Sequence, residues 1–433
     1  MRYLPVWLCF LSMLVLRFVC LLVFLSFCGE MGQPAHAQSI AVKAPFHFKS
    51  TRRHRAIVPI QVQRNLLVIN AWLNGYGPFN FLLDTGVATS IITSPALADS
   101  LGLLHGEKFR VVGAGGADTG LLAYQTDQVA VTLPGVIAPR MSWLVLSEDV
   151  LNLSGYVGVP IHGILGSELF RSFVVTLKPE DGHLLLQDSA TYRAPKGRRW
   201  ASIPLSLERG KAYFTAPVQL NDTLSMPLKL VLDTGASHAL SLELDSDPRL
   251  LGPAKRFPTD LGRGLTGIVQ GYLGRVPSLQ LGKFRLPSVL TSYPNASDVH
   301  TRVDVPRNGN VGYELLKRFL LVIDYPHRRM LLRPNIHFRD AFEHDMSGMD
   351  LLAVGSDFRR FLVLRVIPDS PAAAAGLEVD EELISINFLP VSVFNLTQLS
   401  NMLHSQDGRL LLLLLRRPNG DLHSTTIRLK RQI

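Results

Sequence analysis

An apolar strand pattern runs directly into the tripeptide Asp-Thr-Gly at two places in this sequence, and the two aspartates are Asp84 and Asp233. Residues 81–83 read Phe-Leu-Leu, and residues 230–232 read Leu-Val-Leu. The glycine two positions after each aspartate permits a tight turn and a close approach of backbone N–H groups. Two such motifs in one chain predict a duplicated half-site, in which each half contributes one carboxylate to a shared centre.

The two motifs belong to an internal repeat, which a comparison of the sequence with itself reveals. A Gly-rich stretch follows each aspartate, at residues 113–116 and 262–264. Each copy then closes on an apolar segment that ends in glycine, at residues 164–166 and 311–312. The apolar runs between these landmarks are bounded by the Gly, Pro and Asn turn signals that are typical of β-strands. We therefore expect two related β-rich lobes.

The composition changes after Pro334, where the repeat ends. Apolar strand patterns then occupy residues 361–366 and 410–415, and a helical pattern occupies residues 396–404. A segment of about 90 residues has the usual size of a small independent domain. The organisation that we expect is a signal peptide, a first lobe, a second lobe and a third domain, at residues 1–37, 38–190, 201–335 and 345–433, respectively.

The first 37 residues have the pattern of an export signal. Residues 6–27 are apolar apart from Arg17 and two serines, and residues 35–37, Ala-His-Ala, have the small-x-small form of a signal-peptidase site. We therefore expect an exported protein, either periplasmic or secreted. The alternative is an anchor formed by an uncleaved N-terminal segment, because the apolar stretch approaches the ~20 residues that span a bilayer. A membrane is a partner only in that case.

Cysteine content and charge exclude several classes of function. The three cysteines, Cys9, Cys20 and Cys28, all lie in the N-terminal segment, so the rest of the chain has no disulfide, thiolate nucleophile or thiolate metal ligand. The formal net charge is +9, but the basic residues are scattered, and no basic stripe interleaved with aromatic residues occurs. Nucleic-acid binding is therefore not expected.

The chemistry that a carboxylate pair supports is peptide hydrolysis. Two carboxylates a few ångströms apart cannot both ionise, so they share one proton. One member of the pair deprotonates a water that attacks the peptide carbonyl, and the other protonates first the carbonyl oxygen and then the leaving nitrogen. This chemistry requires no metal and no cofactor. A peptide or protein is therefore the expected substrate of a site formed by Asp84 and Asp233.

These motifs resemble those of aspartic proteases of the retropepsin-like and pepsin-like clan. The closing segment at residues 309–332, with Phe319 and residues 323–326 (Ile-Asp-Tyr-Pro), is similar to that of bacterial exported members, which often carry a C-terminal PDZ domain. Residues 370–372 (Ser-Pro-Ala) and 375–377 (Ala-Gly-Leu) resemble the core motif of that domain. The resemblance implies a mainly β chain with a two-lobed acid-protease fold, made of tandem retropepsin-like β-barrel lobes, and a C-terminal PDZ domain.

The resemblance also implies roles for individual residues. Asp84 and Asp233 are the expected catalytic pair of an aspartic endopeptidase. The residues expected to support the active-site loops are Thr85, Gly86, Thr234 and Gly235. The residues expected in flap hairpins over the cleft are Gly113, Gly115 and Gly116 in the first lobe and Gly262 and Gly264 in the second.

In the third domain we expect peptide binding that recruits substrate. A peptide would add as a strand beside residues 361–366, in a groove closed by the helix at residues 396–404. The segment containing Gly348, Met349 and Leu351 would receive its C-terminal carboxylate. A peptide with a free C-terminus is therefore the expected ligand.

Three residues or segments near the motifs need separate interpretation. Val87 follows the first Asp-Thr-Gly where the family usually has Ala or Ser, so a loss of competence is expected first in that half-site. A third Asp-Thr-Gly, residues 118–120, follows no apolar strand and is expected to form the return turn of the flap. His238 is expected to be a supporting or surface residue, because a carboxylate pair needs no histidine.

Two alternatives remain open at this point. One is a non-catalytic peptide-binding adaptor in which the protease site is degenerate. The other is an intermolecular arrangement, in which each lobe pairs with its copy in another chain, as single-copy relatives require.

Overall fold

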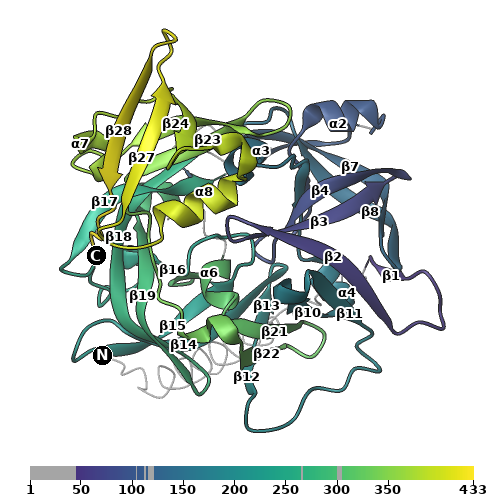
Figure 1. The fold of residues 1–433 in the computed structure, drawn as a ribbon. Helices are drawn as coiled ribbons and strands as arrows, with labels where there is room; N and C mark the ends of the chain where they lie inside the picture. The colour runs from purple at the N-terminus through teal and green to yellow at the C-terminus, as the bar shows by residue number, and fades with distance from the viewer. Residues whose placement is uncertain (1–44, 104, 112–113, 116–120, 265–266, 300–304) are drawn as a thin grey trace, which may run out of the picture. The chain divides into compact units, whose positions relative to one another are not determined.

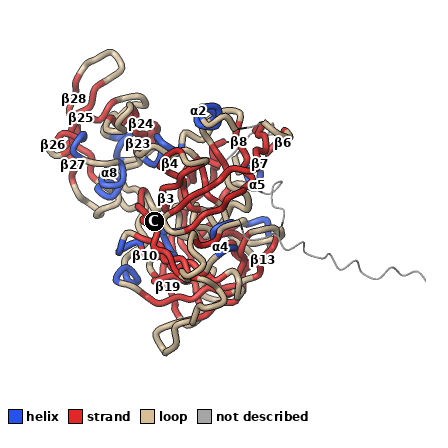
Figure 2. The backbone as a smooth tube through the Cα atoms, turned by 90° about the vertical axis from the view of Figure 1, so that its right-hand side faces the viewer, coloured by secondary structure: helices blue, strands red, loops and turns tan. Residues whose placement is uncertain are grey.

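Strands dominate the computed structural model of the protein, and its helices are short (Figure 2). The structure describes residues 45–103, 105–111, 114–115, 121–264, 267–299 and 305–433. The expected signal peptide, residues 1–37, lies outside these residues. The prediction of a mainly β fold is confirmed. Within the described ranges, no helix combines the length and the apolar character needed to cross a bilayer.

The first repeat contains a meander of three antiparallel strands that leads to the first Asp-Thr-Gly (Figure 1). Exposed and buried residues alternate along β2 (Arg55–Gln63), as expected for a strand with one face on the core. β3 (Leu66–Leu73) follows, and β4 (Tyr76–Leu83) ends in three buried residues. The other elements of this lobe are β1 (His47–Phe48), β5 (Ile91–Ile92), α2 (Pro95–Ser100), β6 (Lys108–Val111), β7 (Leu121–Leu133), β8 (Val136–Leu146), α3 (Leu153–Val157), β9 (Gly163–Leu165), α4 (Glu168–Ser172), β10 (Val174–Lys178), η1 (Pro179–Asp181) and β11 (His183–Gln187).

The second repeat builds its motif on a similar hairpin. β14 (Lys211–Gln219) and β15 (Ser225–Leu232) pair antiparallel, and β15 leads to the second Asp-Thr-Gly. The other elements of this lobe are β12 (Ala201–Pro204), β13 (Ser206–Glu208), β16 (Leu240–Leu242), η2 (Leu244–Ser246), β17 (Arg256–Gly264), β18 (Gly267–Leu281), β19 (Phe284–Pro294), α5 (Ala296–Val299), β20 (Gly309–Val311), α6 (Tyr313–Leu316), β21 (Phe319–Asp324), β22 (Arg329–Pro334) and η4 (Ile336–Arg339).

In both repeats, the strand before the aspartate pairs in parallel with the closing apolar segment. Leu83 lies opposite Leu165 in the first repeat, and Leu232 lies opposite Val311 in the second. Parallel neighbours need a long crossover connection, which is why these partners are so far apart in the sequence. The landmarks that repeat in the sequence are therefore paired in the same way in the two halves.

A common sheet joins the two repeats. β10 of the first repeat pairs antiparallel with β21 of the second, and in the order β12-β22-β21-β10-β11-β2 the first three strands come from the second repeat and the last three from the first. The hydrophobic core beside this sheet contains residues from both repeats, including Phe170, Phe319 and Tyr325. The lobes are therefore held together by backbone pairing as well as by side-chain packing.

The C-terminal domain is a six-stranded sheet with a hydrophobic cluster of its own. The strand order is β23-β24-β25-β27-β28, with β26 beside β25, and β27 and β28 form the yellow hairpin in Figure 1. A capping box between Asn395 and Gln398 begins helix α8. The elements of this domain are β23 (Met349–Val354), β24 (Arg360–Val366), α7 (Pro371–Ala374), β25 (Glu382–Ile386), β26 (Leu389–Pro390), η5 (Val391–Val393), α8 (Leu396–Leu403), β27 (Leu410–Arg416) and β28 (Leu422–Arg428).

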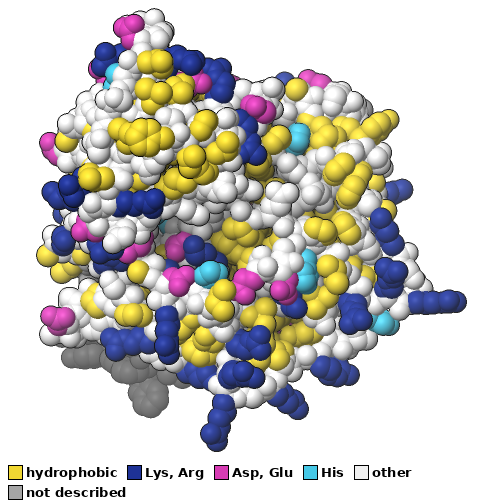
Figure 3. All heavy atoms as spheres, in the orientation of Figure 1, with side chains coloured by type: hydrophobic (Ala, Val, Ile, Leu, Met, Phe, Trp, Pro, Cys, Tyr) yellow, Lys and Arg dark blue, Asp and Glu magenta, His cyan; other side chains and the backbone are white. Residues whose placement is uncertain are grey.

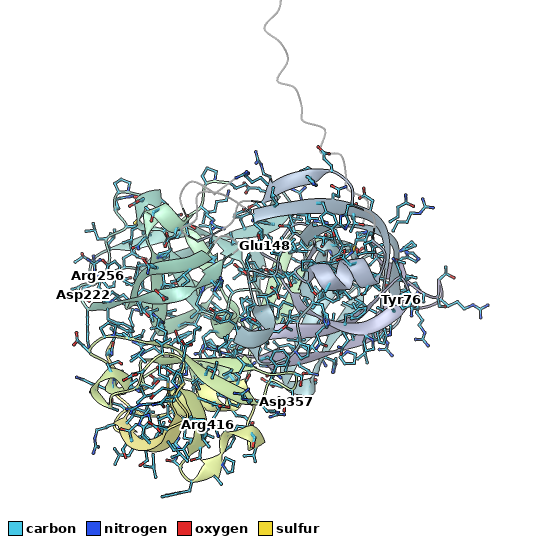
Figure 4. All side chains as sticks on the ribbon, turned by 90° about the horizontal axis from the view of Figure 1, so that it is seen from above. Tyr76, Glu148, Asp222, Arg256, Asp357 and Arg416 are labelled. Carbon is cyan, nitrogen blue, oxygen red and sulfur yellow. The ribbon has the colours of Figure 1, made fainter. Side chains whose placement is uncertain are left out.

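The charged side chains are distributed over all three parts. On the face shown in Figure 3, Lys and Arg side chains are spread around the surface and do not gather over one element. Figure 4 labels surface residues in each part: Tyr76 in the first lobe, Asp222 in the second and Arg416 in the C-terminal domain.

Candidate active site

Asp84 and Asp233 lie beside each other, immediately after β4 and β15. The N–H of Asp84 donates to the carbonyl of Leu165 at 2.9 Å, and the N–H of Asp233 donates to the carbonyl of Val311 at 3.0 Å. The parallel strand pairing within each repeat therefore fixes the aspartate of that repeat, and the backbone contact is the same in both. A Cβ built on Gly86 would lie 2.9 Å from Asp233 Oδ1 and 3.0 Å from Asp84 Oδ1, so the two carboxyl groups lie beside the same point. The structure thus brings the two predicted residues together within one chain.

The two threonines of the motifs bond reciprocally across the lobes. Thr85 Oγ1 donates to the carbonyl of Leu232 at 2.6 Å and accepts from the N–H of Thr234 at 3.0 Å. Thr234 Oγ1 donates to the carbonyl of Leu83 at 2.9 Å and accepts from the N–H of Thr85 at 3.1 Å. Both threonines are fully buried. The four bonds hold the two aspartate loops in a fixed relative position.

The two glycines of the motifs leave space for the carboxylates. A Cβ on Gly86 would lie 2.9 Å from Asp233 Oδ1, and a Cβ on Gly235 would overlap the carboxyl group of Asp84. The N–H of Gly86 donates to Asp84 Oδ1 at 2.6 Å, and the N–H of Gly235 donates to Asp233 Oδ1 at 3.1 Å. Any side chain at either position would displace a carboxylate. Both positions therefore require glycine.

The pKa of the Asp84 carboxyl is raised well above its usual range. Burial is the largest cause, followed by repulsion from the carboxylate of Asp233. The N–H of Gly86 and the charge of Lys211 act in the opposite direction and are outweighed. Asp84 therefore holds a proton under conditions in which an exposed aspartate is ionised, as a pair that shares one proton requires.

Val87, which departs from the family pattern, keeps the backbone contact of its counterpart. The N–H of Ser167 donates to the carbonyl of Val87 at 2.9 Å, and the N–H of Tyr313 donates to the carbonyl of Ala236 at 2.7 Å. The Val87 side chain packs against a small apolar cluster of the first lobe. The backbone of the first loop is therefore held in the same way as that of the second, despite the larger side chain.

Sequence reasoning missed two residues that hold the loop after Asp84. The buried carboxylate of Glu168 accepts from the N–H and from the Oγ of Ser90, both at 2.9 Å. Ser90 Oγ in turn accepts from the N–H of Gly166 at 2.9 Å. A signal was present, because a glutamate follows the closing glycine by two positions in both copies, as Glu168 and Glu314.

Sequence reasoning also missed Asn310, which contacts the second aspartate. Asn310 Nδ2 donates to Asp233 Oδ2 at 2.7 Å, and His238 Nε2 lies 3.3 Å from Asn310 Oδ1. Burial lowers the pKa of His238, while the charge of Asp233 and the hydrogen bond to Asn310 oppose that shift. His238 therefore reaches the carboxylate through the amide of Asn310.

The glycines of these stretches that the structure describes are Gly115, Gly262 and Gly264. Gly262 and Gly264 belong to β17, close to the turn into β18, and Gly115 follows β6. The backbone of Gly264 approaches Ala114 so closely that a Cβ would overlap the Ala114 carbonyl, so the end of β17 lies against residue 114. Three predicted features lie outside the described residues: Gly113, Gly116 and the third Asp-Thr-Gly at residues 118–120.

The strand that the sequence predicted to receive a peptide lies inside the sheet of the C-terminal domain. β24 contains residues 361–366, and it pairs with β23 on one side and with β25 on the other. β23 occupies one edge along the length of β24, and β25 occupies the other edge at residues 361 and 362, so the prediction of an added strand beside residues 361–366 is wrong. The strand at the end of the sheet is β23, and α8 packs against it. The strand that lies at the end of the sheet and beside α8 is therefore β23 and not β24.

The residues predicted to receive a carboxylate lie at the start of β23. Gly348 has a φ of +75°, a conformation that favours glycine, and a Cβ there would overlap the side chain of Ser370. Met349 and Leu351 are 1% and 3% exposed and belong to the hydrophobic cluster of the domain. Their side chains therefore stabilise the domain, and it is their backbone that lies at the edge of the sheet.

The first lobe packs against both β23 and α8. α3 packs against β23, and a Cβ on Gly155 of α3 would lie 2.9 Å from Leu352 Cδ1. On α8, Thr397 Oγ1 accepts from the N–H of Arg64 at 3.0 Å and donates to Gln63 Oε1 at 2.8 Å. The edge strand and the helix beside it are therefore both in contact with the first lobe.

The second lobe also contacts this domain, at Arg365. Arg365 of β24 pairs with Asp350 of β23 at 2.6 Å and with Asp260 of β17 at 3.3 Å. β17 contains Gly262 and Gly264 near its end. This ion pair therefore links the C-terminal domain to the β17–β18 hairpin of the second lobe.

Two family models agree with the resemblance. A family model described as aspartyl protease matches residues 69–169, and one described as PDZ domain matches residues 362–417. Among solved structures, the chain is similar to the crystal structure of Basic 7S globulin from soybean at 10% identity and a TM-score of 0.38, with 66% of this chain and 97% of that chain covered. No curated protein matches the sequence.

The chain therefore contains an aspartyl protease domain and a C-terminal PDZ domain, as the sequence motifs predicted. The protease family model includes Asp84 and ends before Asp233. The pairing of the second aspartate with the first is thus an observation of the structure alone. In the described part of the chain, no group of three or more His, Cys, Asp or Glu side chains is arranged to hold a metal ion.

Proposed function

We propose that this protein is an aspartic endopeptidase whose catalytic pair is Asp84 and Asp233. The observation that carries the proposal is the pairing of the two carboxyl groups, which lie beside the same point at Gly86, at the ends of two equivalent strands. The reciprocal bonds of Thr85 and Thr234 support it, because they fix against each other two loops that are 149 positions apart in the sequence. The raised pKa of Asp84 supplies the protonated member of the pair.

The reaction consumes one water and breaks one C–N bond. One carboxylate takes a proton from the water as its oxygen bonds to the scissile carbonyl carbon, and the protonated carboxyl group donates its proton to the carbonyl oxygen. In the second step a proton passes to the leaving nitrogen, and the other carboxylate takes a proton from the tetrahedral intermediate. The C–N bond breaks, and the pair returns to its starting state with one proton.

Digestion of a mixed peptide library by the purified protein between pH 3 and pH 7 tests this proposal. We expect internal cleavage by the wild-type protein and none by Asp84→Asn or Asp233→Asn. Cleavage that persists in both variants would indicate a contaminating protease and would contradict the proposal. No cleavage at any pH would favour the alternative of a peptide-binding adaptor with a degenerate site.

We further propose that the PDZ domain binds an extended peptide along β23 and thereby recruits substrate. The edge position of β23 and the adjacent helix α8 support this site. A peptide would have to displace α3 and the contacts of Thr397 with Arg64 and Gln63. The apparent affinity for the peptide is therefore the intrinsic affinity multiplied by the fraction of molecules in which β23 and α8 are uncovered.

Thr397→Val is expected to strengthen peptide binding severalfold, because it removes both hydrogen bonds that hold α8 against the first lobe. Fluorescence polarisation of labelled peptides with free C-termini, titrated with the full chain, measures this effect. Thr426→Val on the exposed face of β28 is the matched control and should leave the affinity unchanged. Equal effects of the two variants, or no binding to either, would argue against this site.

A further inference from the structure

The two half-sites differ at one equivalent position beside the aspartates. The pairing of β4 with β9 places Leu82 opposite Ile164, and the pairing of β15 with β20 places Val231 opposite Asn310. Ile164 and Asn310 are therefore equivalent in the repeat. The first half-site has an aliphatic side chain where the second has an amide, so the repeat is asymmetric next to its reacting groups.

The amide of Asn310 supplies Asp233 with a donor of its own. Asn310 Nδ2 donates to Asp233 Oδ2 at 2.7 Å, while Asp233 Oδ1 accepts from the N–H of Gly235 at 3.1 Å. A hydrogen bond to the charged form of a carboxylate favours that form. Both oxygens of Asp233 therefore receive an N–H group, whereas Ile164 offers no polar atom to Asp84.

His238 fixes the orientation of this amide. Its Nε2 lies 3.3 Å from Asn310 Oδ1, so a proton on Nε2 donates to the amide oxygen and turns the amide nitrogen toward Asp233. The opposite orientation would direct the amide oxygen at the carboxylate, which is favourable only if Asp233 carries the proton. The protonation state of Asp233 and the orientation of Asn310 are therefore linked.

We propose that Asn310 is a positioning residue that makes Asp233 the ionised member of the pair and leaves the shared proton on Asp84. This inference rests on the proposed peptidase function. Asp233 is then the base that takes a proton from the water, and Asp84 is the acid that protonates the carbonyl oxygen. In the second step Asp233 donates to the leaving nitrogen, and Asp84 takes a proton from the intermediate.

The other titratable groups near the pair are consistent with this assignment. His238 faces Asp233 and is neutral at neutral pH, because burial lowers its pKa. Tyr325 of the common core is affected by both aspartates and by Arg171, and burial raises its pKa, so its phenol stays neutral. Lys211 acts on Asp84 from β14 and favours its charged form, but burial and repulsion from Asp233 are stronger.

The test is the pH dependence of kcat/KM for a peptide cleaved by the wild-type protein. Asn310→Ile, which copies the first lobe, is expected to move the acid limb to higher pH by about one unit, because the carboxylate loses a donor. Asn310→Ala serves the same purpose if the isoleucine variant does not fold. Ile164→Val is the control for altered packing and should leave the acid limb in place. An acid limb that does not move in a folded, active Asn310 variant would overturn the assignment.

A second measurement does not require turnover and so separates this inference from the proposed function. Aspartate labelled with ¹³C at the carboxyl carbon reports ionisation by NMR, and Asp84→Asn and Asp233→Asn identify the two signals. Between the two titration steps of the pair, we expect the ionised signal to belong to Asp233 and this preference to weaken in Asn310→Ile. An ionised Asp84 beside a protonated Asp233 would overturn the inference, even if the wild-type protein cleaves peptides.

Discussion

Replacing Asp84 with asparagine is expected to reduce peptide hydrolysis by at least about 10³-fold and, at neutral pH, to stabilise the folded protein. Activity is lost because an amide can neither accept the proton of the water nor return one to the substrate. Stability rises because the variant no longer places a buried carboxyl group beside Asp233. The two effects are measured by a peptide cleavage assay and by thermal unfolding of the same preparation.

The sign of the stability change follows from the raised pKa of Asp84. The unfolded chain releases this proton near the ordinary value of 3.8, whereas the folded chain retains it to higher pH. Over that interval the folded state binds more protons, so the free energy of unfolding falls as the pH rises. The stabilisation by Asp84→Asn is therefore expected to be largest at neutral pH and above and to vanish below about pH 4.

Asp222→Asn provides the matched control for this experiment. Asp222 lies in the exposed turn between β14 and β15 and is labelled in Figure 4. The same chemical change at this position should alter neither cleavage nor the melting temperature at any pH. If Asp84→Asn instead lowers the melting temperature at neutral pH, the two carboxylates do not repel each other in the folded protein, and the proposed pair is wrong.

The outline of the protease fold could be predicted because its signals are local and repeated. Strand patterns, turn residues and the two Asp-Thr-Gly motifs each lie within a few residues, and the repeat supplies an internal check on every one of them. The bare tripeptide would not have been enough, because residues 118–120 have the same three letters without an apolar strand. The order of landmarks indicated that Asp84 and Asp233 are equivalent, and the structure pairs them.

The errors and omissions concern contacts between residues far apart in the sequence. Nothing within residues 361–366 shows that β24 is paired on both sides, because strand order depends on the whole sheet. The contact of Arg64 with Thr397 joins the first lobe to the last helix and has no local pattern. The sequence shows that Asn310 stands where the first repeat has Ile164. The role of Asn310 became evident only from its hydrogen bond to Asp233.

Thr85→Val is expected to have the opposite effect on stability and a smaller effect on activity than Asp84→Asn. The substitution keeps the shape of the side chain and removes the hydroxyl, which leaves the carbonyl of Leu232 and the N–H of Thr234 buried without their partner. Each lost partner costs about 1–3 kcal/mol, so the free energy of unfolding should fall by roughly 2–5 kcal/mol. Thermal or denaturant unfolding measures this loss.

Cleavage by Thr85→Val should fall by about 10- to 100-fold, because the hydroxyl fixes one aspartate loop against the other and a displacement near 1 Å costs about 10²-fold in rate. Thr85→Ser keeps the hydroxyl and is the matched control, with most of the activity and stability retained. Thr234→Val should reproduce both losses, since its bonds are the mirror of those of Thr85. If only one of the two threonines matters, the lobes do not hold each other reciprocally. The catalytic centre would then depend on one half of the repeat and not on the match between the two.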